Sequence, residues 1–456
     1  MALSPDLPAL PRRTAHARRL LLLGLPLIGS RLAQFAIGMT DTIMVGWFDV
    51  TALAALTIGH MIFFVLFLVG SGFAVAVSPM VASALATGDT RQVRRITRMG
   101  LWLSVFYAAL AIPLMLFGEP LLLALGQEPE VARLGGLYLS VTAWGLPPAL
   151  VIMTMTSYFA ALERTRAILF VMVGMAAFNV IVNYALIFGN LGAPEMGLVG
   201  AAVASVIINI AGAVALLVHA LRATPETELL RNIWRPDWEV FALVFRLGWP
   251  IGLTWLSEVS LFGAASVMMG WVGTLELAAH GIALQIASAT FMVHLGLSQA
   301  ATVRTGRAWG GRDLEALRDV AIAAIALSMG FAVLTVAVFL AFPELLVGLF
   351  IDPADPVRPT LLAAGTLLLA YAALFQLFDA GQVLALGLLR GVQDTRVPMV
   401  MAAISYWGIG APAAYALGFP LGLGGPGIWL GLTLGLVVAA GLLNWRFWRG
   451  RALRGC

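Results

Sequence analysis

The stretch LFQLFDAGQVLALGLLRGVQDTRVPM, Leu374–Met399, has a first half that is apolar enough for a lipid bilayer and yet carries a carboxylate, Asp379. Its second half passes through a polar turn, 390–396, and Pro398 opens the next apolar run. A carboxylate at mid-membrane costs roughly 2.5–3.5 kcal/mol on insertion scales, and helix packing does not require that cost. The stretch therefore predicts membrane-spanning helices and makes Asp379 the first candidate functional residue.

The composition places the whole chain in a membrane. Of its 456 residues, 61% are hydrophobic and 11% are charged, whereas soluble domains carry about 25% charged residues. Twelve apolar segments are each long enough for a tilted transmembrane helix. We predict an all-α polytopic membrane protein of two six-helix lobes, residues 1–225 and 226–456, separated by the longest polar connection, 222–239.

The arginines indicate which way the helices run. All 27 basic residues are arginine, and 24 of them fall in the two tails or in the loops that follow even-numbered spans. Arg133 and Arg358 fall in the opposite loops, and Arg31 falls inside the first span. Because positive residues accumulate on the cytoplasmic side, both termini are predicted to be cytoplasmic. We expect a bacterial inner-membrane protein that is surrounded by lipid, acts as a monomer and does not bind nucleic acid.

The two predicted lobes resemble each other in sequence. Leu23-Gly24-Leu25-Pro26 returns 224 positions later as Leu247-Gly248-Trp249-Pro250, and Gly46-Trp47 returns as Gly270-Trp271 at the same offset. Further along, ERTR (163–166) is echoed 230 positions later by QDTR (393–396). Such parallel repeats predict a pseudo-twofold axis along the membrane normal, with a substrate cavity between the lobes. Pro26 and Pro250 lie in helix interiors, so we expect them to bend the first and seventh spans.

Three carboxylates lie within predicted spans: Asp41, Glu258 and Asp379. The one arginine predicted inside a span, Arg31, is ten residues from Asp41, which is about 15 Å along a helix, so a direct pair is not expected. Glu258 and Asp379 have no obvious fixed counter-charge. They are then either protonated or neutralised by a mobile cation, and both alternatives point to ion or proton coupling.

Other polar residues of the spans give weaker signals. Asn179 and Asn183 share a helix face, where they would either contribute ligands for a sodium ion near Asp41 or form hydrogen bonds between helices. Gln34 occupies the repeat position of Glu258, and Gln285 and Gln376 are further candidates for a polar cavity. Three histidines are interpreted as packing residues rather than proton relays: His60, His280 and His294.

The sequence excludes several chemistries. It contains no GxxxxGK[ST] phosphate loop and no HExxH metal motif, and its single cysteine is the last residue, Cys456. No catalytic triad is indicated by spacing. We therefore expect no cofactor other than a coupling ion, and no enzymatic activity.

Several stretches resemble the MATE family of multidrug and toxic-compound extrusion transporters, and in particular its NorM branch. The likeness covers the whole chain and is carried by GMTDTIMVGWF (38–48), ALAAL (52–56), GWPIGLTWLSEVSLF (248–262), ELAAHGIALQIASATFMV (276–293) and FDAGQVLALGLLRGVQDTRVPM (378–399). An acid in span seven together with one in span ten is typical of that branch. Two residues depart from the family pattern: His294 stands where proline is usual, and Arg31 stands where a neutral polar residue is usual.

The resemblance implies cation-coupled antiport, in which sodium or protons move inward and organic cations move outward. It implies that Glu258 and Asp379 are the coupling and drug-binding carboxylates, and that Asp41 with Asn179 and Asn183 forms a cation site. A flippase for lipid-linked oligosaccharides, of the same superfamily, is the nearest alternative and predicts an arginine-rich cavity. An integral-membrane enzyme predicts catalytic groups clustered near one interface, and a passive channel predicts flux without a counter-ion.

Overall fold

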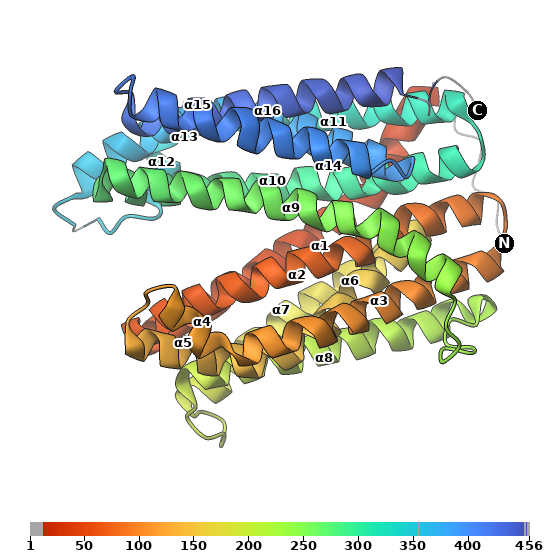
Figure 1. Cartoon of the computed structure of the whole chain (residues 1–456), viewed down its shortest axis with the longest axis horizontal. Helices are drawn as coiled ribbons and strands as arrows, with labels where there is room; N and C mark the ends of the chain where they lie inside the picture. Colours follow the sequence, from red (N-terminus) through yellow and green to blue (C-terminus); the bar gives the residue numbers. More distant parts are fainter. Residues whose placement is uncertain (1–11, 354, 451–452, 454–456) are drawn as a thin grey trace. The chain divides into compact units, whose positions relative to one another are not determined.

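The computed structural model describes residues 12–353, 355–450 and 453, and this part of the chain is built from helices and contains no strand (Figure 1). Twelve helical segments are long and apolar enough to cross a membrane, as the hydropathy predicts. They are α1 (Arg12–Phe48), α2 (Val50–Ala86), α3 (Thr90–Leu116), α5 (Pro129–Thr142) joined through η1 (Ala143–Gly145) to α6 (Leu146–Ala161), α7 (Thr165–Phe188), α8 (Gly197–Ala223), α9 (Trp238–Val272), α10 (Thr274–Gly310), α11 (Leu314–Ala341), α13 (Arg358–Gly391), α14 (Arg396–Ala403) joined through η3 (Ile404–Gly410) to α15 (Ala411–Gly418), and α16 (Gly424–Arg449). The connections contain the short helices α4 (Gly118–Ala124), η2 (Pro225–Thr227) and α12 (Pro343–Gly348).

The turns between helices repeat along the chain with the offsets seen in the sequence. Asp89 caps α3 by accepting from the backbone N–H of Gln92, and Asp313, 224 positions later, caps α11 through Ala316 in the same way. Glu163 and Gln393, 230 positions apart, both take a φ of 59° in the turns after α6 and α13. Matching caps and turns therefore support the internal repeat at the level of the backbone.

Two compact units make up the described structure. We call Gly29–Leu256 the N-unit, and Met1–Ile28 together with Ser257–Cys456 the C-unit. Their boundaries fall within two turns of Pro26 and Pro250, inside α1 and α9, because each of these helices changes its packing partners there. The predicted lobes, 1–225 and 226–456, are defined by the sequence repeat, whereas the two units are defined by contacts between residues. The division into lobes stays a prediction. Both prolines lie inside continuous helices, and the bends expected at them also stay predictions.

Each unit contains a close helix crossing at a glycine that has a counterpart in the other unit through the repeat. In the N-unit, a Cβ on Gly72 of α2 would collide with the backbone of Gly248 and Gly252 on α9. In the C-unit, a Cβ on Gly296 of α10 would lie 2.9 Å from the backbone nitrogen of Ile28 on α1. Gly72 and Gly296 are 224 positions apart, and so are Ile28 and Gly252. The repeat therefore extends to the contacts of α1 and α9, which need glycine because two backbones meet.

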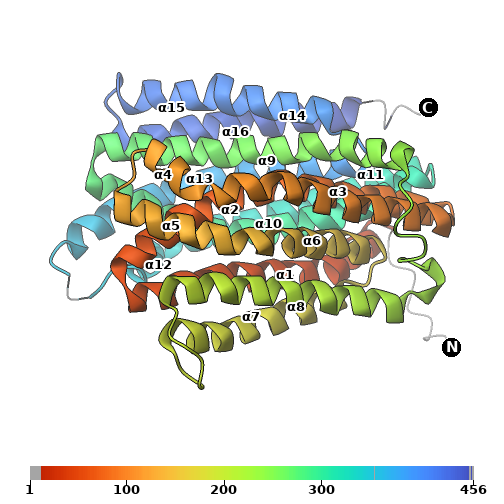
Figure 2. The same ribbon diagram turned by 60° about the horizontal axis from the view of Figure 1, so that its bottom comes forward.

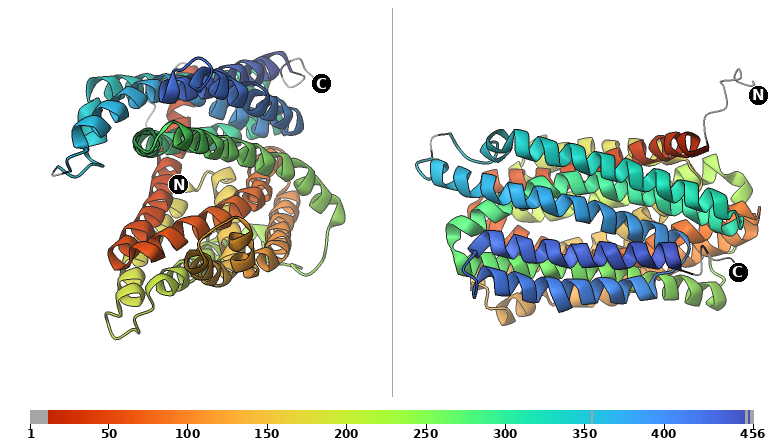
Figure 3. Two further views of the ribbon diagram at one scale, coloured as in Figure 1. Left: turned by 60° about the vertical axis from the view of Figure 1, so that its left-hand side comes forward. Right: turned by 90° about the horizontal axis from the view of Figure 1, so that it is seen from above.

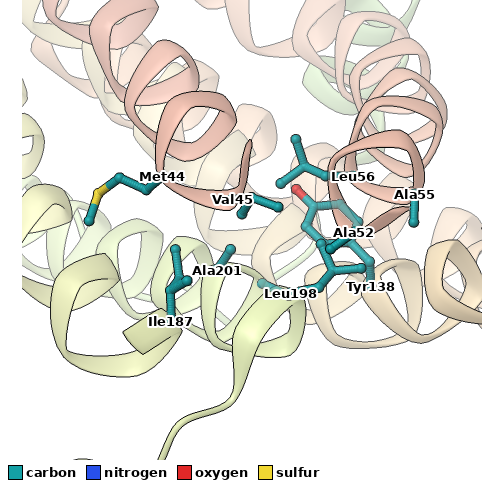
Figure 4. Close-up of a cluster of buried hydrophobic side chains, with 10 residues drawn as sticks. Met44, Val45, Ala52, Ala55, Leu56, Tyr138, Ile187, Leu198 and Ala201 are labelled. Atoms are coloured by element: carbon teal, nitrogen blue, oxygen red, sulfur yellow. The ribbon is translucent and has the colours of Figure 1, made fainter. Parts of the chain in front are cut away.

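The helices within each unit are held together by apolar side chains. One cluster of the N-unit joins Met44 and Val45 of α1 to Ile187, Leu198 and other buried residues of α2, α5, α7 and α8 (Figure 4). Within the C-unit, α15 and α16 pack side by side, as the two further views show (Figures 2 and 3). This packing fixes the positions along the helix axes at which polar residues of neighbouring helices meet.

The eleventh span departs from a regular α-helix. Between α14 and α15, residues 404–410 form a π-helix, η3. Pro412, the second residue after it, has no N–H with which to reach the carbonyl of Gly408, so the preceding turn widens. π-Turns are frequent at functional sites, and this one carries the fully buried Tyr406.

Candidate functional site

The N-unit holds Asp41 among three hydrogen-bond donors. Asn179 Nδ2 and Asn183 Nδ2, both on α7, donate to Asp41 Oδ1 at 3.0 and 2.5 Å, and Ser205 Oγ of α8 donates to Oδ2 at 3.3 Å. Asp41 is 8% exposed and both asparagines are fully buried. The predicted grouping of Asp41, Asn179 and Asn183 is thus present in the structure, and the carboxylate lies inside the protein rather than at an interface.

The atoms around Asp41 are suited to a hard cation. Both asparagines contribute an amide oxygen, and Asn183 Oδ1 has no hydrogen-bond partner. Sodium and similar ions prefer carboxylate, amide and hydroxyl oxygens. Among the described residues, no group of three or more His, Cys, Asp or Glu side chains is placed to hold a metal, so a transition-metal centre is not indicated. The site fits an ion with oxygen ligands, and a half-turn of the Asn183 amide would present its oxygen to that ion.

The C-unit brings Glu258 of α9 and Asp379 of α13 together. The two carboxylates lie close enough to interact electrostatically, and they are 7% and 2% exposed. The sequence placed them 121 residues apart, in different spans. Their meeting in one cluster agrees with the roles that the family resemblance implies.

Arg390 corrects one expectation about this cluster. The sequence predicts a polar loop at Arg390 and no fixed counter-charge for Glu258 and Asp379. In the structure Arg390 belongs to the last turn of α13, is 6% exposed, and lies close enough to Glu258 for their charges to interact. A helix that continues to Gly391 keeps this arginine within the bundle. With all three groups ionised, the cluster carries one net negative charge.

Two further buried polar residues complete the cluster. The Gln382 amide lies beside both Glu258 and Tyr406, yet neither of its polar atoms forms a hydrogen bond of good geometry. The Tyr406 hydroxyl also has no such partner. Buried polar atoms are paired in the great majority of cases, so these groups retain capacity to bind a ligand. Neither residue is among the predicted site residues. Gln382 is signalled by its place three residues after Asp379 on the same helix face, whereas nothing in the sequence marks Tyr406.

Hydrogen bonds to α10 hold α13 in place. Ser298 Oγ donates to the Val383 carbonyl and Thr302 Oγ1 donates to the Gly387 carbonyl, each at 2.8 Å. Gln376 Nε2 donates to the Ala287 carbonyl at 3.0 Å and to Thr290 Oγ1. Gln376 therefore ties two helices together, and its role as a cavity residue stays a prediction.

The remaining candidates lie outside both clusters. Arg31 Nη1 donates to Gln34 Oε1 at 3.2 Å. Arg31 is one of the two residues that depart from the family pattern, and Gln34 occupies the repeat position of Glu258. Gln285 is half-buried on α10. His294 contacts Ser328 at 2.9 Å and packs against Phe331, while His280 contacts Ser266, as expected for packing residues. Arg451, Arg454 and Cys456 lie outside the described residues.

Twelve membrane-spanning helices in two similar repeats, with buried carboxylates in both units and an oxygen-lined site at one of them, define a polytopic membrane transporter by fold and site. The sequence profile of the MatE family matches residues 26–185 and 250–416. The two matched segments begin 224 positions apart, in agreement with the repeat. The chain belongs to the MatE family.

Relatives and solved structures agree with this assignment. The chain is 48% identical to the probable multidrug resistance protein NorM of Rhizobium meliloti (strain 1021), over 95% of this chain and 93% of that protein. It is 45% identical to the protein of the same name from Agrobacterium fabrum, over 95% and 94% of the two chains. The crystal structure of MATE in the bent conformation has a TM-score of 0.86 to this structure at 20% identity, covering 97% of each chain, and supports the fold.

Proposed function

We propose that the chain is a multidrug efflux antiporter that exports organic cations in exchange for inward sodium or protons, by alternating access. Membership of the MatE family and the similarity to proteins named NorM support multidrug efflux. The single observation that supports the exchange is the buried cluster of Glu258, Asp379 and Arg390. Two carboxylates and one guanidinium leave one negative charge in a region of low dielectric.

The net charge of this cluster is the basis for competition. An isolated buried charge is costly unless it is paired, so the cluster binds one further positive charge. An organic monocation satisfies it, and so does a sodium ion or a proton. Because one cation neutralises the site, binding of the inward-moving cation favours release of the organic one. Gln382 and Tyr406 supply hydrogen bonds that adapt to whichever cation is bound.

The Asp41 site of the N-unit is proposed to bind the coupling ion only. Three donors on α7 and α8 hold the Asp41 carboxylate at 2.5–3.3 Å. A small ion needs no more space than these groups leave. A sodium ion would take oxygens of Asp41, Asn183 and Ser205, whereas a proton would reside on Asp41 itself. In either case the ion is cargo of the transporter and not a resident cofactor.

The glycine crossings support the alternating-access part of the proposal. In terms of the predicted lobes 1–225 and 226–456, the crossing of α2 with α9 and that of α1 with α10 each join one lobe to the other. Both crossings depend on backbone contact at glycine, which permits close approach and, when the helices separate, leaves no bulky side chain to extract. Rocking of two repeats about a central site is the usual motion in such folds.

Orientation, location and assembly complete the proposal. The excess of arginine in the tails and in alternate loops supports cytoplasmic termini in a bacterial inner membrane. An even number of spans, twelve, is consistent with both ends on one side. We propose that the protein acts as a monomer in lipid, without enzymatic activity.

The test uses inside-out membrane vesicles and a fluorescent organic cation. Export appears as dye uptake, driven separately by a sodium gradient and by a pH gradient, each with the higher cation concentration in the lumen. Uptake driven by one or both gradients is expected, and the driving gradient names the coupling ion. Dye movement that ignores both gradients and does not saturate would identify a passive channel instead.

A further inference from the structure

A pocket lies within the C-unit, where the first turns of α1 meet the turn between α10 and α11. It measures about 600 Å³, which is within the usual range for small-molecule sites. Arg304 Nη2 of α10 lies 3.4 Å from His16 Nδ1 of α1, and Arg13 Nε of α1 donates to Asp319 Oδ1 of α11 at 3.2 Å. The pocket is therefore bounded by three helices that polar contacts hold together.

The charges that line this pocket are divided between the helices. The positive groups belong to α1 and α10, and the negative groups belong to α11 and its cap: Arg19, Arg304 and Arg307 on one side of the division, Asp313, Glu315 and Asp319 on the other. Among the described residues of the lining the formal charges cancel, with histidine counted as neutral. A pocket with positive and negative groups on different helices is complementary to a ligand that carries both charges.

The internal repeat indicates that the fold does not require these arginines. At the offset of 224 the three arginines of the pocket correspond to uncharged residues of the N-unit: Leu243, Met80 and Ser83. The same positions of the repeat therefore form helices without a guanidinium at any of the three. A structural need shared by both repeats does not explain the charges, and a ligand of the C-unit does.

The pocket lies next to side chains that face lipid. Leu22 and Leu25 follow Arg19 by about one and two turns of α1, and they are 58% and 59% exposed. Exposed leucines of a membrane-spanning helix contact acyl chains. The excess of arginine predicts that this end of α1 is cytoplasmic, at the level of the lipid headgroups. A phospholipid can therefore place its headgroup in the pocket and its acyl chains along these leucines.

We propose that this pocket binds the headgroup of a phospholipid that carries both a phosphate and a primary ammonium group, as phosphatidylethanolamine does. Guanidinium groups suit phosphate oxygens, and basic pockets between cytoplasmic helix ends are known to hold lipid headgroups. The carboxylates of α11 accept from the ammonium group. One of them, Asp313, is fixed in position because its Oδ1 accepts from the backbone N–H of Ala316 at 2.9 Å. Binding of this lipid does not depend on the transport of organic cations.

The test is native mass spectrometry of the full chain in detergent, titrated with three lipids that have the same acyl chains. Phosphatidylethanolamine carries the complete group, phosphatidylcholine has methyl groups in place of the ammonium hydrogens, and phosphatidylglycerol has a net negative charge. Phosphatidylethanolamine is expected to bind about three- to tenfold more tightly than either of the others, the range of a hydrogen bond to a charged group at a partly exposed site. Equal affinity for all three, or tightest binding of phosphatidylglycerol, would overturn the proposal.

Two variants separate the two halves of the headgroup. Arg19→Gln is expected to lower the affinity for phosphatidylethanolamine and phosphatidylcholine alike, by about three- to tenfold, because both contain the phosphate. Glu315→Gln should weaken phosphatidylethanolamine alone, so that its preference over phosphatidylcholine shrinks. Arg18→Gln is the control, since Arg18 is an exposed neighbour outside the described lining, and it should bind all three lipids like the wild type.

Folding of these variants is checked by the thermal midpoint in detergent. Arg19 and Glu315 are both exposed, so both variants are expected to fold. If one of them does not, the other decides. A lipid preference equal to that of the wild type in every variant that folds would contradict the proposal.

A free phosphate ion has the same oxygens as the headgroup. Inorganic phosphate in large excess over the lipid distinguishes the two. A lipid site predicts that phosphatidylethanolamine stays bound, because its acyl chains add contacts along α1 that the free ion lacks. Displacement of the lipid by inorganic phosphate would assign the pocket to a free anion and reject the lipid proposal.

Discussion

Asp41 and Asp379 are both buried aspartates in a spanning helix, yet their surroundings differ in one respect. The Asp41 carboxylate accepts hydrogen bonds from Asn179, Asn183 and Ser205, and these three donors belong to α7 and α8, which pack together. Asp379 instead faces a second carboxylate, Glu258, in a cluster where several buried polar atoms have no partner. The carboxylate of the first site is held by three donors and the site is small, whereas the second site is underbonded.

The difference indicates two kinds of ligand. A carboxylate held by several short donors has fixed geometry, which suits a small ion of defined radius. A cluster with excess charge and free donors and acceptors tolerates cations of different shape, because each can take up a different subset of bonds. The adjacent π-helix places Tyr406 in this cluster and adds to its adaptability. The comparison therefore predicts that the two aspartates respond differently to the same substitution.

The largest effect is expected from Asp379→Asn. It converts the net charge of the cluster from −1 to zero, so an organic cation would leave the Glu258–Arg390 pair with an uncompensated positive charge. Coupled efflux of a fluorescent cation from proteoliposomes should fall by at least about a hundredfold, the cost of an unpaired buried charge. Asp394→Asn is the control, since Asp394 lies in the following turn and pairs with Arg446. Undiminished gradient-driven efflux in Asp379→Asn would remove the basis of the exchange mechanism.

Asp41→Asn should separate coupling from drug binding. Efflux is expected to fall by about tenfold or more, because the coupling ion loses its carboxylate. Dye affinity, measured by fluorescence polarisation in detergent, should stay within about threefold of the wild type. Ser205→Ala removes the longest of the three hydrogen bonds and should have a smaller effect on efflux. If Asp41→Asn weakens dye binding as much as Asp379→Asn does, the two sites do not differ in the way described.

Arg390→Gln sharpens the account of the underbonded cluster. Without this cation the cluster carries two net negative charges, which favours dications over monocations. The ratio of methyl viologen to tetraphenylphosphonium efflux should rise by about tenfold, a modest value for one unit of charge in a partly buried site. Arg390→Lys should restore the wild-type ratio. A ratio that is the same in all three proteins would show that Arg390 does not set the charge of the site.

The glycine crossings test whether the two units have equivalent helix packing although their polar sites differ. Gly72→Ala and Gly296→Ala each force a Cβ against the backbone of a neighbouring helix, so both should lower the thermal midpoint in detergent by a similar amount, corresponding to about 1–3 kcal/mol. Gly330→Ala in α11, where nothing lies within 4 Å of the new Cβ, should leave stability unchanged or raise it slightly. Loss of stability at one crossing only would show that the repeat does not extend to these contacts.

Much of the fold follows from the sequence for physical reasons. Twelve apolar segments suffice to predict twelve spans, because a bilayer accepts only helices of sufficient length or closed barrels. The repeats at Pro26 and Pro250 follow from identical neighbours at one offset. The family resemblance predicts a group of Asp41, Asn179 and Asn183, and the two asparagines share a helix face. Their contact in the structure agrees with that grouping.

The rest depends on long-range geometry that periodicity does not contain. Hydropathy falls at the polar turn and so predicts a loop at Arg390, yet α13 continues to Gly391 and buries the guanidinium. The π-helix before Pro412 changes which face carries Tyr406, and a regular period of 3.6 residues cannot place it. Ser205 follows a run of small residues and has no distinguishing pattern. Each residue that the sequence does not place correctly has a side chain whose role depends on contacts with another helix.

The smallest effect concerns a carboxylate outside the spans, which sets the baseline for an ordinary ion pair. Asp237 Oδ2 accepts from Arg95 Nε at 2.6 Å, and mainly this hydrogen bond holds the pKa of Asp237 below its usual value. A lowered pKa means that the pair contributes stability above the unfolded pKa of about 4 and that this contribution is lost as the pH falls below it. Asp237→Asn should therefore lower the thermal midpoint at pH 7 by an amount corresponding to about 1 kcal/mol or less, and the difference from the wild type should shrink in acid. Glu239→Gln, at a side chain that is 89% exposed and 3.5 Å from the same arginine, should change nothing measurable. An equal effect of both variants would mean that net charge, rather than the Arg95 contact, accounts for the stabilisation.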